Sequence, residues 1–295
     1  MLNKLIVIIV FNAAGAISCF GQKAVREISP VATQPTMAVV HGNHLVSSPD
    51  HKKGKNKLLI SMAGTGSSAE GLAAFDSVGN ALGFHTISLD YKNEVVTTVC
   101  RASFDSSCFD SFRQEIVFGT PVSDTVRVDS TNSLYNRIYR LLEFLSAQFP
   151  KEGWASFFQN RKIVWANITV AGHSQGAGHA AFLGKHFLLS KVIILAGPQD
   201  FLDYFNRPAP WINREGKTPP ERYVALLHQM DPYGFEKQLA SCLILSQTQV
   251  RDTVSADQLK SGSCNIMVTH VKTKNPHGSV VQAIHADAWK YLLER

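Results

Sequence analysis

The sequence predicts an α/β fold with a mostly parallel central sheet and helices on both faces of that sheet. Short apolar runs at residues 58–62, 168–171 and 191–195 alternate with stretches of helical character. Strands of this kind are buried on both faces. No shift in composition divides the 295 residues. We therefore expect one domain over residues 22–295, with an insertion around residues 92–132.

Residues 1–21 have the character of a secretory signal peptide. Lys4 gives a positive start, residues 5–11 are apolar, and small residues follow. The apolar run is too short to span a bilayer, so the segment predicts cleavage and a secreted or periplasmic protein. The residues before Cys19 also loosely resemble a lipoprotein processing site, which leaves a lipid anchor through Cys19 as an alternative. No further segment is long enough to be transmembrane.

The first half of the domain contains two predicted strands, at residues 58–62 and 84–89, separated by a Gly-rich loop and a helix over residues 69–81. After the insertion, apolar residues recur at helical spacing from Leu134, so one face of that helix should dock on the sheet. Pro150 should end this helix.

The second half alternates in the same way. The predicted strands lie at residues 168–171, 191–195, 223–227 and 266–271. A helix over residues 279–293 should close the chain, with Ser279 as its N-cap.

The most informative run is Gly172-His173-Ser174-Gln175-Gly176, which joins a β-branched strand to a helix of small residues. Strand, sharp turn and helix form the context of a nucleophile elbow, which lifts a serine hydroxyl clear of the sheet. Gly172 and Gly176 lack the Cβ atoms that would collide where strand and helix nearly touch. An ordinary Gly-rich turn is the alternative. The context favours Ser174 as a nucleophile.

A serine hydroxyl needs a base, and the base needs a partner that fixes its tautomer. In a parallel sheet these groups converge from loops at the carboxyl ends of strands. Asp231 and His277 each follow a strand downstream of Ser174, in the order expected for an elbow. Asp200 is the rival acid, since it also follows a strand. His285 is the rival base, but it falls well inside the predicted last helix.

An oxyanion hole needs two amide donors. The amide of Gln175 at the start of the helix is one candidate, and Thr65 or Gly66 in the loop after the first strand would supply the other. That loop lacks the third glycine of a dinucleotide fingerprint and the lysine of a P-loop. A phosphate site is therefore not favoured.

Cysteine usage fits export. The chain has five cysteines, and removal of the signal peptide would leave Cys100, Cys108, Cys242 and Cys264. An even count predicts two disulfides with three possible pairings, of which the local one, Cys100–Cys108 and Cys242–Cys264, is the simplest. Metal-ligand spacings are absent from the sequence, so we expect no metal site.

The formal charge of +6 comes mainly from scattered basic residues. The dense run at residues 51–57 contains no aromatic residues, so a solvated loop is favoured and no nucleic-acid partner is expected.

With these motifs in order, the chain resembles the α/β-hydrolase superfamily, and in particular exported bacterial esterase- or lipase-like serine hydrolases. The likeness covers nearly the whole mature region and is most specific at Ser174. It implies Ser174 as nucleophile, His277 as base, Asp231 as orienting acid and an acyl-enzyme intermediate. Caps and substrate-facing loops often occupy the place of the insertion, whose Phe104, Phe109 and Phe112 would line an acyl pocket or pack elsewhere.

We therefore expect a secreted serine hydrolase that cleaves small-molecule or lipid esters and needs no cofactor. An acyltransferase would use the same residues. A non-catalytic binding protein that retains the fold is the alternative from another class.

Overall fold

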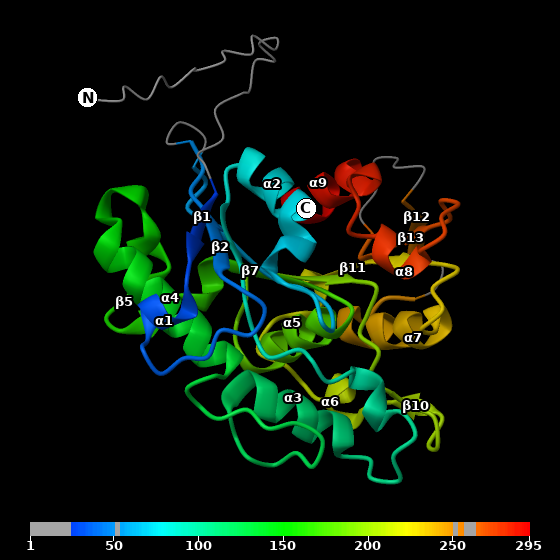
Figure 1. Ribbon diagram of the computed structural model, residues 1–295. Helices are drawn as coiled ribbons and strands as arrows, with labels where there is room; N and C mark the ends of the chain where they lie inside the picture. The colour runs from blue at the N-terminus through cyan, green and yellow to red at the C-terminus, as the bar shows by residue number, and fades with distance from the viewer. Residues whose placement is uncertain (1–24, 51–53, 250–252, 257–263) are drawn as a thin grey trace, which may run out of the picture.

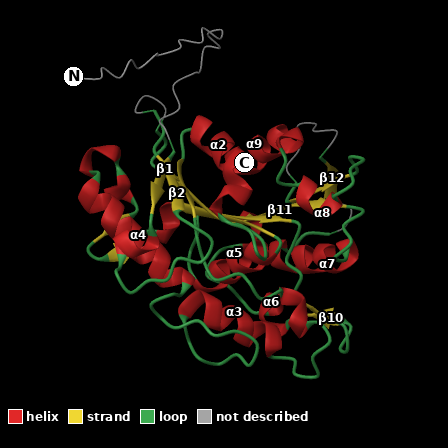
Figure 2. Cartoon of the chain, viewed as in Figure 1, coloured by secondary structure: helices red, strands yellow, loops and turns green. Residues whose placement is uncertain are grey.

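The computed structural model describes residues 25–50, 54–249, 253–256 and 264–295, which form a sheet with helices on both faces (Figures 1 and 2). The predicted signal peptide and Cys19 lie outside the described residues. Within the described part of the chain, no helix combines the length and the apolar character needed to cross a bilayer.

Among the described residues, the central sheet has nine strands in the order β1-β2-β4-β3-β7-β8-β11-β13-β12. β2 is antiparallel to both of its neighbours, and the other pairs are parallel. This confirms the predicted mostly parallel sheet. The strands in that order are Arg26–Ile28, His44–Ser47, His85–Ser88, Leu58–Met62, Ile168–His173, Lys191–Leu195, Tyr223–His228, Ile266–Thr269 and Thr253–Ser255.

Two short hairpins lie outside the sheet. They are β5–β6 (Phe158–Gln159 and Lys162–Ile163) and β9–β10 (Phe201–Leu202 and Arg207–Pro208).

Helices cover the two faces unequally. The helices α1 to α9 are Pro30–Thr33, Ala73–Ala81, Cys108–Phe118, Leu134–Gln148, Gln175–His186, Pro210–Asn213, Phe235–Ser246, Pro276–Ser279 and Ala286–Glu294. α2 and α9 lie on one face, whereas α5 lies against the other with α3 and α6 beyond it (Figure 1).

Successive side chains of a central strand pack alternately into two hydrophobic clusters, one on each face of the sheet. In β8, Val192 and Ile194 belong to the larger cluster, whereas Ile193 and Leu195 point to the smaller one on the opposite face. Because successive strand residues face opposite sides, a wholly apolar strand is the sequence signature of this double burial.

α4 forms as its periodicity predicts. The Ser133 hydroxyl accepts a hydrogen bond from the Asn136 amide and caps the first turn. The apolar stripe is buried, and a short 3-10 turn begins at Pro150 after the helix ends.

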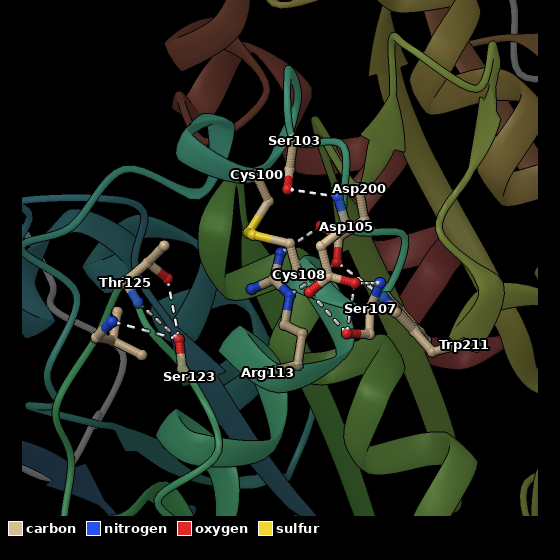
Figure 3. The surroundings of a disulfide bond; sticks show 11 residues. Cys100, Ser103, Asp105, Ser107, Cys108, Arg113, Ser123, Thr125, Asp200 and Trp211 are labelled. Atoms are coloured by element: carbon tan, nitrogen blue, oxygen red, sulfur yellow. Dashed lines mark hydrogen bonds and ion pairs between the residues drawn. A yellow bond between two sulfur atoms is a disulfide. The ribbon is translucent and has the colours of Figure 1, made fainter.

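The insertion contains a helix, α3, and the predicted disulfide between Cys100 and Cys108 (Figure 3). Phe109 and Phe112 are fully buried in the larger cluster, whereas Phe104 is 76% exposed and packs on Tyr204. These aromatic side chains therefore pack in the core and on the surface.

The predicted single helix over residues 279–293 is wrong. The segment forms α8, a 3-10 turn at Ala283–His285, and α9. Gln282 is extended (ψ 148°), and the Trp289 indole donates a hydrogen bond to the Val280 carbonyl, which a continuous helix would have used internally. Ser279 is not an N-cap; instead, the Asn275 side chain caps α8.

The predicted second disulfide, between Cys242 and Cys264, is also wrong. Both cysteines are free thiols and buried. Cys242 belongs to the larger cluster and donates to the Gly197 carbonyl, whereas Cys264 belongs to the smaller cluster on the other face of the sheet. The sheet separates the two sulfur atoms.

Candidate active site

Ser174 lies at the sharp turn between β7 and α5. Its backbone has φ 55° and ψ −115°, a strained conformation for a residue with a side chain, and its amide donates to the Leu195 carbonyl. A Cβ on Gly172 would lie 2.1 Å from the Gly176 carbonyl oxygen, and one on Gly176 would lie 2.1 Å from the Met62 oxygen. The elbow geometry therefore requires glycine at both positions.

Asp231 and His277 come together from the loop after β11 and from α8. His277 Nδ1 lies 2.7 Å from Asp231 Oδ2, and the Tyr233 amide donates to Asp231 Oδ1 at 2.9 Å. A carboxylate partner fixes the proton on Nδ1, which leaves Nε2 as the acceptor. Burial alone would raise the pKa of Asp231, but the hydrogen bond and charge of His277 and the Tyr233 amide outweigh it and lower that pKa.

His173, next to the serine, packs against the same histidine. Its Nε2 is 3.0 Å from the His277 carbonyl oxygen, and the two rings lie 4.8 Å apart. Burial, aided by the neighbouring His277, lowers the pKa of His173 to about 4. A neutral His173 donates this bond and so anchors α8 against the elbow.

Ser174, His277 and Thr65 line one open cleft of about 570 Å³. The hydrogen bond that the structure gives to Ser174 Oγ comes from Gln199 Nε2, at 3.3 Å. Among the described residues, none joins Ser174 directly to His277. Hydrogen bonds between catalytic groups are often long without substrate and tighten when it binds.

The candidate oxyanion loop is tied to the elbow by the Gln175 side chain. With its amide nitrogen facing acceptors, Gln175 donates to Thr65 Oγ1 at 2.6 Å and to the carbonyls of Asn93 and Val95. The Gly66 amide donates to the Asn93 carbonyl at 3.1 Å. The Gly66 amide is thus already engaged within the protein.

The rival residues lie elsewhere. Asp200 is fully buried in an ion pair with Arg113, and its carboxylate also accepts from the Trp211 indole at 2.9 Å (Figure 3). His285 is buried at the start of α9 and does not line the cleft. The carboxylate that His277 contacts is therefore that of Asp231 and not that of Asp200.

Sequence reasoning missed three residues that shape this site: Asn93, Arg113 and Gln199. Gln199 lies in the loop after the carboxyl end of β8, next to the rival acid Asp200. The argument that functional groups gather at the carboxyl ends of parallel strands therefore applies to Gln199 as well. Arg113 and Asn93 lie within the insertion, where no periodicity indicates burial.

Among the described residues, no group of three or more His, Cys, Asp or Glu side chains is placed to hold a metal ion.

The sheet order, the strained serine between strand and helix, an acid on a later loop and a histidine on a later short helix together define an α/β-hydrolase fold. No known protein family is matched by the sequence, and no curated protein matches it. Among solved structures, the chain is similar to S-formylglutathione hydrolase (FrmB) from Staphylococcus aureus, with 11% identity and a TM-score of 0.50 over 93% of this chain and 99% of that one.

It is also similar to an S-formylglutathione hydrolase from Agrobacterium tumefaciens, with 12% identity and a TM-score of 0.50 over 94% of this chain and 98% of that one. At such low identity these likenesses establish the fold. The chain therefore has the α/β-hydrolase fold.

Proposed function

We propose that the protein is an exported serine hydrolase that cleaves carboxylic esters through Ser174, His277 and Asp231. The observation that carries the proposal is the hydrogen-bonded His277–Asp231 pair on the same cleft as a serine held in elbow geometry. Each group has the environment its role requires: a strained, raised hydroxyl, an imidazole with a fixed tautomer, and a carboxylate whose pKa is lowered.

In acylation, the Ser174 proton passes to His277 Nε2 while Oγ forms a bond to the ester carbonyl carbon, whose π electrons move to oxygen. The amides of Gln175 and Thr65 would hold that oxygen. When the intermediate collapses, the bond from carbon to the alcohol oxygen breaks and the alcohol takes the proton from His277. Water then repeats these steps, which releases the acid and restores Ser174.

The cleft favours a short acyl group. Polar side chains such as Ser67, Thr98 and Asn275 line much of it, and the aromatic residues of the insertion do not. Long acyl chains require an extended apolar wall. We therefore propose acetate- or butyrate-sized acyl groups rather than fatty acyl chains.

Export is supported by the disulfide between Cys100 and Cys108, because such bonds persist in oxidising compartments. The predicted signal peptide agrees with this location.

A panel of p-nitrophenyl esters from acetate to decanoate, without added alcohol, tests the proposal. We expect many turnovers per protein molecule with acetate and butyrate, and a steep fall with longer chains. Absence of turnover with every ester would contradict the hydrolase. A second assay adds an alcohol to the same panel, and conversion of that alcohol to an ester faster than acid is released would make the protein an acyltransferase instead.

A further inference from the structure

We propose that Gln199 is a further catalytic residue, whose side-chain amide stabilises the negative charge that develops on Ser174 Oγ. This inference rests on the proposed function, since it assumes that Ser174 is the nucleophile. It assigns to the reacting serine a polar contact separate from the one with the base, and separate also from the amides that would hold the ester oxygen.

The contact itself is direct. Gln199 Nε2 lies 3.3 Å from Ser174 Oγ, and the two residues are only 5% and 8% exposed. Because the amide donates, Oγ accepts, and the hydroxyl proton stays available for His277. A hydrogen bond to a group that is becoming anionic strengthens as the charge grows, and more so away from bulk water.

The loop that contains Gln199 packs closely against the turn at Ser174. Ala196 adopts φ 48°, which is unusual for a residue with a side chain. A Cβ on Gly197 would lie 2.6 Å from the Ala177 Cβ and 3.0 Å from the Ser174 carbonyl oxygen. The backbone preceding Gln199 therefore cannot move towards α5.

The buried guanidinium of Arg113 forms hydrogen bonds to the residues that follow Gln199 and Ser174. Arg113 donates to the two carboxylate oxygens of Asp200 at 3.0 and 2.5 Å, and through Nη1 to the Gln175 carbonyl at 2.8 Å. Asp200 directly follows Gln199, and Gln175 directly follows Ser174. Arg113 thus fixes the spacing between donor and nucleophile, and a Cβ on Gly178 would collide with it at 2.0 Å.

The hydrogen bond from Gln199 should accelerate the steps in which Ser174 Oγ carries negative charge. As the proton leaves for His277 and before the bond to carbon is complete, Oγ is the strongest acceptor. In the acyl-enzyme Oγ is an ester oxygen and accepts weakly. When water resolves the acyl-enzyme, Oγ leaves carbon and takes the proton back, so the same donor assists again.

The test is a single-turnover experiment with protein in excess over p-nitrophenyl acetate, in which p-nitrophenol release reports acylation. We compare wild type with Gln199→Met, which keeps the side-chain length without a donor, and with Gln199→Ala. Gln159→Ala in the distant β5–β6 hairpin is the matched control, and Ser174→Ala gives the background rate.

We expect both Gln199 variants to lower the saturating acylation rate about 10- to 100-fold. The half-saturating protein concentration should change less than threefold, melting should stay cooperative, and Gln159→Ala should behave as wild type. An unchanged acylation rate in Gln199→Met overturns the inference, and so does a faster rate, which would mean that Gln199 restrains the serine. If wild type itself acylates no faster than Ser174→Ala, the proposed function has failed instead.

Discussion

Asp231 Oδ2 accepts a 2.7 Å hydrogen bond from His277 Nδ1, although the two residues are 46 positions apart in the chain. The bond crosses from the loop after β11 to α8. It leaves Nε2 of the imidazole as the atom able to accept a proton in the cleft. The proposed chemistry depends on this tautomer.

The same substitution at two aspartates should therefore give different results. Asp231→Asn keeps the shape but cannot stabilise a charged imidazole, so kcat should fall by about four orders of magnitude at neutral pH. Asp200→Asn instead leaves Arg113 without its charge partner inside the protein and should lower the free energy of unfolding by about 3–5 kcal/mol. Ester kinetics and urea unfolding on both variants measure this. A stable Asp200→Asn protein with a greater loss of kcat than Asp231→Asn would reverse the assignment of the acid.

Gly172→Ala should prevent the elbow from forming, because its Cβ would overlap the Gly176 backbone. We expect little folded protein, measured as the yield of soluble protein with a cooperative melting transition. Gly71→Ala is the matched control, since its Cβ would make ordinary contacts at 3.5 Å. Equal yields from the two variants would show that strand and helix do not meet so closely.

The disulfide should make stability depend on redox conditions. Closing the loop between Cys100 and Cys108, which are eight positions apart, should contribute about 2–3 kcal/mol. A reductant should therefore lower the melting temperature of wild type and of Cys242→Ala by similar amounts, and should leave Cys108→Ala unchanged. A reductant effect that disappears in Cys242→Ala would contradict the free thiol at that position.

Asp76 should make stability depend on pH. Burial raises the pKa of Asp76 to about 7, although hydrogen bonds from Ser61 and Ser88 oppose the shift. Between the unfolded pKa of about 3.9 and about 7, the folded state keeps a proton that the unfolded state has lost, so stability falls as pH rises. The slope from this group is about 1.4 kcal/mol per pH unit, and it ends above about pH 7.

Asp76→Asn removes that titration while retaining an acceptor for the Ser61 hydroxyl. Urea unfolding at about pH 5 and about pH 7 should therefore show a smaller loss of stability in the variant than in wild type. Parallel losses in the two proteins would mean that Asp76 is ionised in the fold at both pH values.

The central strands could be predicted because β3, β8 and β11 are mostly apolar, a pattern typical of strands that are buried on both faces. The strands β1, β2 and β12 were not predicted, because they are short and carry polar residues. The elbow could be found because the steric conflict between β7 and α5 selects glycine at positions close in sequence. Asp231 and His277 were placed at the carboxyl ends of strands, and the structure brings those two ends together.

Other features depend on contacts that sequence periodicity does not contain. The last helix is broken by a bond from the Trp289 indole to the Val280 carbonyl, although its apolar spacing fits a continuous helix. The second disulfide was predicted from the even number of cysteines. That number does not show that Cys242 and Cys264 lie on opposite faces of the sheet. Charged residues usually lie at the surface, so the sequence does not indicate that Arg113 and Asp200 are buried. Both are buried in this fold because they form an ion pair with each other.

The central claim is that Ser174 is an activated nucleophile, and covalent labelling with a fluorophosphonate tests it most directly. After tryptic digestion, the account predicts that the adduct lies on the peptide 163–185, at Ser174, and that Ser174→Ala takes up no label while melting as wild type does. A folded wild-type protein that stays unlabelled, or equal labelling of Ser174→Ala, would contradict it.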